Sequence, residues 1–178
     1  TATGLTTVGA ANTLTTVAGI PLYRGDTSSI YTHDVSGTDS TATGNTAFGI
    51  QAMDAITTGD SNSAFGLDAL GANTTGANNT AMGKSALEVN TTGDNNVALG
   101  MDTLSANTTG TRNLAIMKNA LNSSDTENDN IAIGYDAMTT NTAGGTENIA
   151  IGNYAGDAIT SGDENVVVGY QAGTALTS

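Results

Sequence analysis

Three evenly spaced aspartates are the residues that come nearest to a catalytic set. Asp68, Asp102 and Asp136 are 34 residues apart. Two carboxylates can hydrolyse glycosidic bonds when they lie about 5 to 9.5 Å apart, depending on the stereochemical outcome. If 34 residues make two turns of a stacked structure, neighbouring aspartates would be separated by about 9.6 Å. That is too wide for a retaining hydrolase and suits an inverting one only loosely, so we interpret the three as a solvated, outward-facing column.

The other reactive residues do not form a recognisable site. His33 is the single histidine, and no partner has the spacing of a catalytic triad or a metal site. Residues 93–96 and 162–165 weakly resemble calcium-binding turns, but those turns need a repeat based on nine residues. We therefore expect no catalytic residues, no metal and no cofactor, and we predict that the protein is not an enzyme.

A repeat, Asn-x-Ala-apolar-Gly, must position these residues, because it recurs along most of the chain. Its steps are 17 residues, with a single step of 18. A constant period of this size indicates stacked, nearly identical units. Numbering each unit from its asparagine, position one is Asn45, Asn62, Asn79, Asn96, Asn113, Asn130, Asn148 and Asn165. The glycines at position five are Gly49, Gly66, Gly83, Gly100, Gly134, Gly152 and Gly169.

The period and composition predict an all-β fold, a parallel β-solenoid or β-roll of about eight 17-residue coils. Helical repeats are longer, at about 33 to 47 residues. A short unit rich in Gly, Asn and Thr accommodates two short strands, which we place at positions two to five and seven to ten, with Thr-Thr-Gly turns between them. Coils stacked at about 4.8 Å would give a rod of roughly 40 Å. The repeated asparagines are predicted to form amide ladders along it.

The first predicted strand is apolar on both faces. Positions two and four lie on one face, and position three, which is almost always alanine, lies on the other. One face can line the coil interior, whereas the other would leave a long apolar stripe that soluble monomers rarely expose. We therefore predict self-association of parallel chains, although the sequence does not decide which face is the interface. The candidate core or interface residues at position four are Phe48, Phe65, Met82, Leu99, Ile116, Ile133, Ile151 and Val168.

The unit beginning at Asn79, read as Asn-Thr-Ala-Met-Gly-Lys-Ser-Ala-Leu and followed by Asn-Thr-Thr-Gly from Asn90, resembles the repeats of phage tail fibres. It also resembles repeats of secreted bacterial fibre proteins with a self-cleaving chaperone, and of trimeric autotransporter adhesin heads. The resemblance covers about residues 44–178 and implies a left-handed, homotrimeric, parallel β-roll that adheres to surfaces. Departures at Met117, Glu127 and Gly144-Gly145 predict local irregularity.

Charge excludes several classes of partner. The net charge is −13, and the cations are Arg24, Lys84, Arg112 and Lys118. Such a surface repels nucleic-acid phosphates and anionic lipids, so we expect no nucleic-acid binding. Membrane insertion is not expected either, because no apolar run approaches the roughly 18 residues needed to span a membrane. No signal peptide is visible, and we expect a processed product or a fragment of something longer.

Residues 1–43 lack the repeat and are predicted to form a cap or docking segment, whereas residues 44–178 form the solenoid domain. Terminal units of solenoids are atypical because they cap the stack. An apolar terminal strand could instead join one subunit to the next. Both alternatives remain open.

We predict a structural and adhesive fibre segment, located outside the cell or on the virion surface. Its expected partners are copies of itself, as a trimer, and a cell-surface glycan or protein. The alternative is a self-assembling extracellular filament subunit joined head to tail through residues 1–43. Ice binding by threonine columns is disfavoured, because the columns lie in turns and are interrupted at Asp125 and Ala143.

Overall fold

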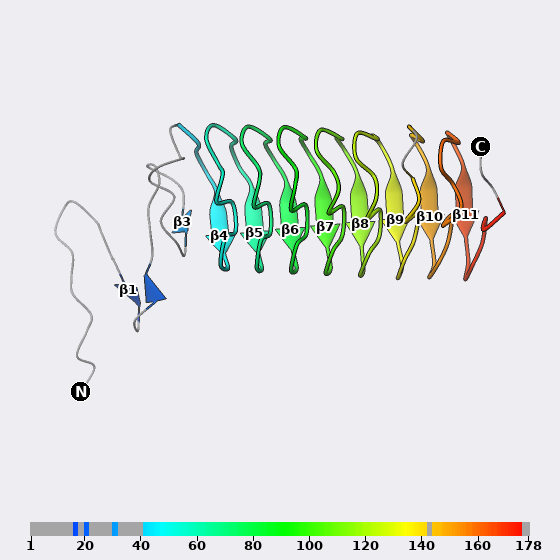
Figure 1. The fold of residues 1–178 in the computed structure, drawn as a ribbon, viewed down its shortest axis with the longest axis horizontal. Coiled ribbons are helices and arrows are strands. Elements are labelled where there is room, and N and C mark those ends of the chain that lie inside the picture. Colours follow the sequence, from blue (N-terminus) through cyan, green and yellow to red (C-terminus); the bar gives the residue numbers. More distant parts are fainter. Residues whose placement is uncertain (1–15, 18–19, 22–29, 32–40, 142–143, 176–178) are drawn as a thin grey trace.

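The computed structural model describes residues 16–17, 20–21, 30–31, 41–141 and 144–175. These residues form short strands, turns and bends, and they include no helix (Figure 1). The strands are β1 (Thr16–Val17), β2 (Ile20–Pro21), β3 (Ile30–Tyr31), β4 (Thr46–Phe48), β5 (Ser63–Phe65), β6 (Thr80–Met82), β7 (Val97–Leu99), β8 (Leu114–Ile116), β9 (Ile131–Ile133), β10 (Ile149–Ile151) and β11 (Val166–Val168).

The strands from β3 to β11 form one parallel sheet in chain order, and β1 and β2 form a separate antiparallel pair. Between neighbouring coils the register pairs each strand residue with its own counterpart, as in Ala64 with Ala81. The coils from β4 to β11 therefore stand in a row (Figure 1). This confirms the predicted all-β parallel solenoid with a 17-residue period. The sheet also reaches into residues 1–43, because Tyr31 of β3 pairs with Ala47.

Each coil contains one strand, and the second strand that we predicted at positions seven to ten is wrong. Those positions form a turn instead. Their residues at positions seven and nine have φ between 48° and 74° in all eight coils, for example 57° at Asp68 and 52° at Leu70. A left-handed residue interrupts an extended chain. The turn directs Leu70 into the coil, where it is fully buried. Burial of such a side chain is worth about 1.5–3 kcal/mol, which offsets a backbone cost of about 1–2 kcal/mol.

The interior of the rod is narrow and consists mainly of small side chains, with a large side chain at position nine in the first six coils. The alanines at position three point inward and are fully buried, as are most alanines at position eight. Position nine supplies the large residue in the first six coils. These residues are Met53, Leu70, Leu87, Leu104, Leu121 and Met138.

The glycines at position five allow the coils to approach one another closely. Their φ values lie between 131° and 148°, a region that side-chain-bearing residues rarely adopt. A Cβ atom on Gly83 would lie 2.4 Å from the carbonyl oxygen of Gly100 in the next coil. The glycine repeat therefore has a steric cause.

Candidate functional site

The outward face of the parallel sheet carries the apolar residues at position four. Along each strand position three is buried, and positions two and four are half-buried or exposed. At the two ends Phe48 is 41% exposed and Val168 is 65% exposed. The structure thus places the candidate core or interface residues on the surface, and the alanines inside. We name this surface the strand stripe: Phe48, Phe65, Met82, Leu99, Ile116, Ile133, Ile151 and Val168.

The strand stripe is uncharged along its whole length. Positions one to five of the eight units contain no Asp, Glu, Lys or Arg, although the chain carries a net charge of −13. At its first coils the rings of Phe48 and Phe65 are stacked, with centroids 5.6 Å apart and planes 1° from parallel. At position two the polar Thr46 gives way to Ile131 toward the C-terminal coils, which broadens the apolar surface. Such a face can pack against an apolar partner without leaving a charge unpaired.

Beside the strand stripe, at positions six and seven, lies a group of aromatic rings that we name the tyrosine ridge: Tyr135, Tyr154 and Tyr170. Tyr154 meets Tyr135 edge to face at 5.4 Å and Tyr170 at 6.1 Å. Desolvation raises the pKa of the Tyr154 hydroxyl, and Tyr135, Asp136 and Tyr170 add to this shift. The ridge joins three successive coils.

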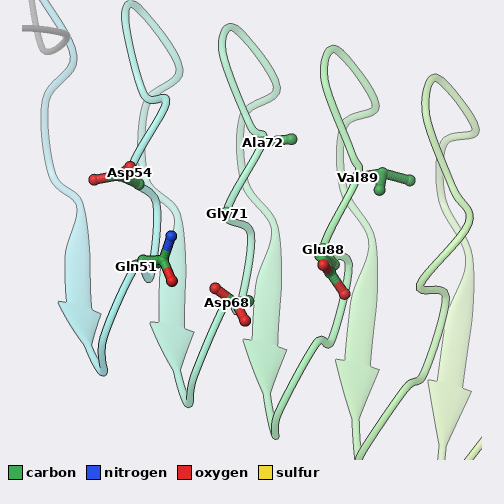
Figure 2. A pocket seen from close by; sticks show the side chains of 7 residues that line it. All are labelled: Gln51, Asp54, Asp68, Gly71, Ala72, Glu88 and Val89. Carbon is green, nitrogen blue, oxygen red and sulfur yellow. The ribbon is translucent and has the colours of Figure 1, made fainter.

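An open hollow of about 210 Å³ lies over the first three coils (Figure 2). Figure 2 shows that its carboxylates, Asp54, Asp68 and Glu88, come from three successive coils, with Gly71 leaving space between them. No cationic side chain lines the hollow. Within the described part of the chain, no cluster of three acidic, histidine or cysteine side chains could hold a metal ion. Of the three spaced aspartates, the hollow contains only Asp68.

The position-one asparagines form a buried ladder, as predicted, but their bonds run mainly to the backbone. Asn45 Oδ1 accepts a hydrogen bond from the N–H of Asn62 in the next coil at 2.8 Å. Asn45 Nδ2 donates to the carbonyl of Gly59, which closes its own coil at 2.8 Å. Direct amide-to-amide bonds occur only in the later coils, as from Asn165 Nδ2 to Asn148 Oδ1 at 3.0 Å. This arrangement is structural, and it consumes the polar atoms that a ligand would need.

A second asparagine ladder at position twelve was not predicted. Asn90 Nδ2 donates to Asn73 Oδ1, and Asn107 Nδ2 donates to Asn90 Oδ1, each at 2.8 Å. All three are fully buried. Each begins an Asn-Thr-Thr triplet that fits the sequon for N-glycosylation, and burial makes these asparagines inaccessible in the folded coil. The 17-residue spacing of these asparagines was visible in the sequence. We interpreted them as part of the turn because Thr-Thr-Gly follows each of them. The ladder stops where Ser124 replaces asparagine, and Asn107 Oδ1 is left without a hydrogen bond.

Glu127 and Gly144 both depart from the repeat, and in the structure the two departures compensate for each other through a direct contact. The buried Glu127 carboxylate accepts bonds from the N–H groups of Asp125 at 2.6 Å and Thr126 at 3.0 Å. Its other oxygen accepts the N–H of Gly144 in the next coil at 3.1 Å. Gly110 is the equivalent of Glu127 in the preceding, regular coil. A Cβ atom on Gly110 would lie 2.3 Å from Asn107 Oδ1, so a regular coil excludes a side chain at this position.

At positions sixteen and seven of the repeat, the residue type alternates from one coil to the next. At these two positions the true repeat is therefore two coils long. At position sixteen, Asp94 Oδ1 accepts the N–H of Ala77 one coil earlier at 2.7 Å. Asp60, Asn128 and Asp163 make the equivalent bond, also at 2.7 Å. At position seven Asn119 Nδ2 donates to Asp136 at 2.7 Å. Because position seven carries an aspartate only in every second coil, neighbouring aspartates at this position are about 9.6 Å apart instead of about 4.8 Å, which reduces the repulsion between them.

One ion pair occurs among the described residues. Arg112 Nε and Nη2 contact the two Asp129 oxygens at 2.6 and 2.7 Å on the rod surface. The pair lowers the pKa of Asp129 and raises that of Arg112. His33 and Arg24 lie outside the described residues, so our expectations for them stay predictions.

Comparison with models of protein families gave no matching family, and comparisons with curated proteins and with solved structures gave no match either. No helix in the described ranges is long and apolar enough to cross a membrane.

Proposed function

We propose that this protein is a structural and adhesive segment of an extracellular fibre, such as a phage tail fibre or a cell appendage. In this proposal parallel copies associate through the strand stripe. The observation that carries it is an apolar, charge-free outward face on a chain with a net charge of −13. A surface that avoids charge over eight coils, beside a strongly acidic remainder, suits burial against another protein.

The geometry of the coils favours identical copies as the partner. Every coil presents the same positions on the same face, so parallel chains can place like residues at the same level along a common axis. The stacked Phe48 and Phe65 and the broad aliphatic surface around Ile131 and Ile133 would then meet their own counterparts. We propose three copies on the basis of the resemblance to trimeric fibre repeats.

Oligomeric mass in solution tests this proposal. Sedimentation equilibrium should give three times the 17.6 kDa of a single chain. Phe65→Asp or Ile133→Asp should give a monomer, because each places an unpaired charge in the buried interface. Both side chains point outward, so the far-ultraviolet circular dichroism of the monomer should match the wild type.

Thr75→Asp is the matched control, because it adds the same charge to an exposed turn away from the strand stripe. Its mass should equal that of the wild type. A strictly monomeric wild-type protein would contradict the proposal. So would a Phe65→Asp variant that keeps the assembled mass.

A filament subunit joined head to tail is the second candidate, and one observation favours it. The strand β3 shows that residues 1–43 can add a strand to the sheet, although they lack the repeat. A strand from the part of the chain before β3 could add to the sheet of another copy in the same way. Deleting residues 1–29 keeps β3 in place. Filaments would then stop growing, whereas association through the strand stripe would persist, and electron microscopy distinguishes the two outcomes.

A further inference from the structure

The tyrosine ridge is an aromatic surface that the proposed self-association does not use. Its rings lie at positions six and seven, beyond the glycine that follows the strand in each of the last three coils. The chain has five tyrosines, and three of them meet here. Because the contacts are edge to face, the rings do not cover one another, and Tyr170 remains 70% exposed. Tyr135 and Tyr154 are half-buried beside it, and an aromatic cluster with an exposed ring is a common feature of binding sites.

Polar groups that could accompany a ligand lie beside the rings. The N–H of Tyr154 bonds to the carbonyl of Tyr135 at 2.8 Å, and the N–H of Gln171 bonds to that of Asn153 at 3.0 Å. These bonds hold positions six and seven of the last three coils side by side. Asn153 Oδ1 accepts the N–H of Tyr135 at 3.0 Å, which leaves its amide as a donor at the surface. The exposed Gln171 adds a second amide.

The charges near the ridge narrow the ligand class. Asp136 acts electrostatically on Tyr154, and the last three coils carry five acidic residues and no lysine or arginine. The nearest cation in the sequence of coils is the exposed Lys118, at position six of the coil before Tyr135. The Tyr154 hydroxyl, whose pKa is raised by desolvation and by the neighbouring Tyr135, Asp136 and Tyr170, can donate and accept a hydrogen bond as a neutral phenol. A surface with this excess of acidic over basic residues disfavours phosphates, sialic acids and other anions.

We propose that the tyrosine ridge binds a neutral saccharide. A sugar ring presents an apolar C–H face that can pack on Tyr170 and hydroxyl groups that can bond to Asn153, Gln171 and Asp136. Aromatic rings combined with a few oriented polar groups meet both requirements. The inference rests on the proposed adhesive function for its biological meaning, but the binding itself requires only one chain.

An array of immobilised neutral oligosaccharides of glucose, galactose, mannose and N-acetylhexosamines tests the proposal with the full chain. The wild type should bind at least one of these glycans. Tyr170→Ala should weaken that binding about tenfold, because it removes the most exposed ring. Tyr170→Phe should retain most of it, since the stacking surface remains.

Ile50→Ala is the matched control, because Ile50 occupies position six of the first coil and is 72% exposed. It should bind like the wild type. Absence of binding to every glycan, or equal binding by Tyr170→Ala, would overturn the proposal. A lower oligomeric mass for Tyr170→Ala would also overturn it, because the ridge would then be part of the interface between copies.

The monomeric Phe65→Asp variant separates this inference from the proposed function. Isothermal titration of that variant with the glycan found on the array should give the single-chain affinity. Glycan binding by a wild-type protein that never assembles would sustain the ridge and contradict the fibre. Assembly of a wild-type protein that binds no glycan would support the fibre and contradict saccharide binding at the ridge.

Discussion

At the scale of single residues, the side-chain amide joins each coil to its neighbours. Asn79 is fully buried, and all its groups are satisfied. Its N–H donates to Asn62 Oδ1, its own Oδ1 accepts the N–H of Asn96, each at 2.9 Å, and its Nδ2 donates to the Gly93 carbonyl at 2.8 Å. Buried polar groups favour a unique arrangement only when every partner is present. The ladder therefore fixes the register between coils as well as contributing stability.

Asn79→Ala should lower the free energy of unfolding by about 2–5 kcal/mol, because the Asn96 N–H and the Gly93 carbonyl would each lose a buried partner. Urea denaturation followed by circular dichroism measures this change. Thr75→Ala, at an exposed position, should change stability by less than about 0.5 kcal/mol. Equal effects of the two substitutions would show that the ladder does not stabilise the coils.

At the scale of the coil, the sequence predicted the first strand but not the path that follows it. Alternation around Ala64 showed two apolar faces, yet could not show that the smaller residue points inward. That outcome depends on Leu70, which fills the interior from a left-handed turn with φ of 52°. Apolar residues at positions seven to ten were compatible with a strand, and composition does not reveal positive φ at leucine. The sequence therefore identified the residues of the strand stripe, but it did not show whether they face the coil interior or the surface.

The irregular coil illustrates a second limit of prediction. Met117, Glu127 and Gly144 could be identified as departures, but the coupling of Glu127 with Gly144 could not, because it depends on a contact between successive coils. Ser124 shortens the position-twelve side chain, and its hydroxyl donates a hydrogen bond to one Glu127 carboxylate oxygen at 3.0 Å. The other Glu127 oxygen accepts the N–H of Gly144 at 3.1 Å. The changes at Ser124, Glu127 and Gly144 therefore depend on one another structurally.

A repaired coil should therefore require the changes together. Ser124→Asn combined with Glu127→Gly and deletion of Gly144 should match or exceed wild-type thermal stability, because an amide could again reach Asn107 Oδ1. Glu127→Gly alone should lower the free energy of unfolding by about 1–3 kcal/mol, since it removes the acceptor of several backbone N–H groups. Calorimetry of the two variants compares them, and a triple variant less stable than the single one would refute the coupling.

At the scale of the whole molecule, charge and apolar surface are separated around the rod. The strand stripe is free of charge, whereas carboxylates gather around the hollow at Asp54, Asp68 and Glu88. The tyrosine ridge borders the stripe at the C-terminal coils. A net charge of −13 per copy opposes association, so the charge-free face is where copies can approach with the least repulsion. One rod thus offers chemically distinct surfaces for assembly and for binding.

The two-coil alternation at positions seven and sixteen implies that this rod can lengthen or shorten cleanly only by pairs of coils. Deleting residues 79–95 removes one coil, which brings Asp68 next to Asp102 and takes the Asp94 acceptor from Ala77. Deleting residues 79–112 removes two coils, and Asn119 then follows Asp68 while Asn128 follows Ala77. We expect the loss of unfolding free energy per deleted coil, measured by urea denaturation, to be larger for the single deletion. Equal losses would contradict this expectation. If gene duplication built this protein, the heritable module was 34 residues, twice the period that its backbone displays.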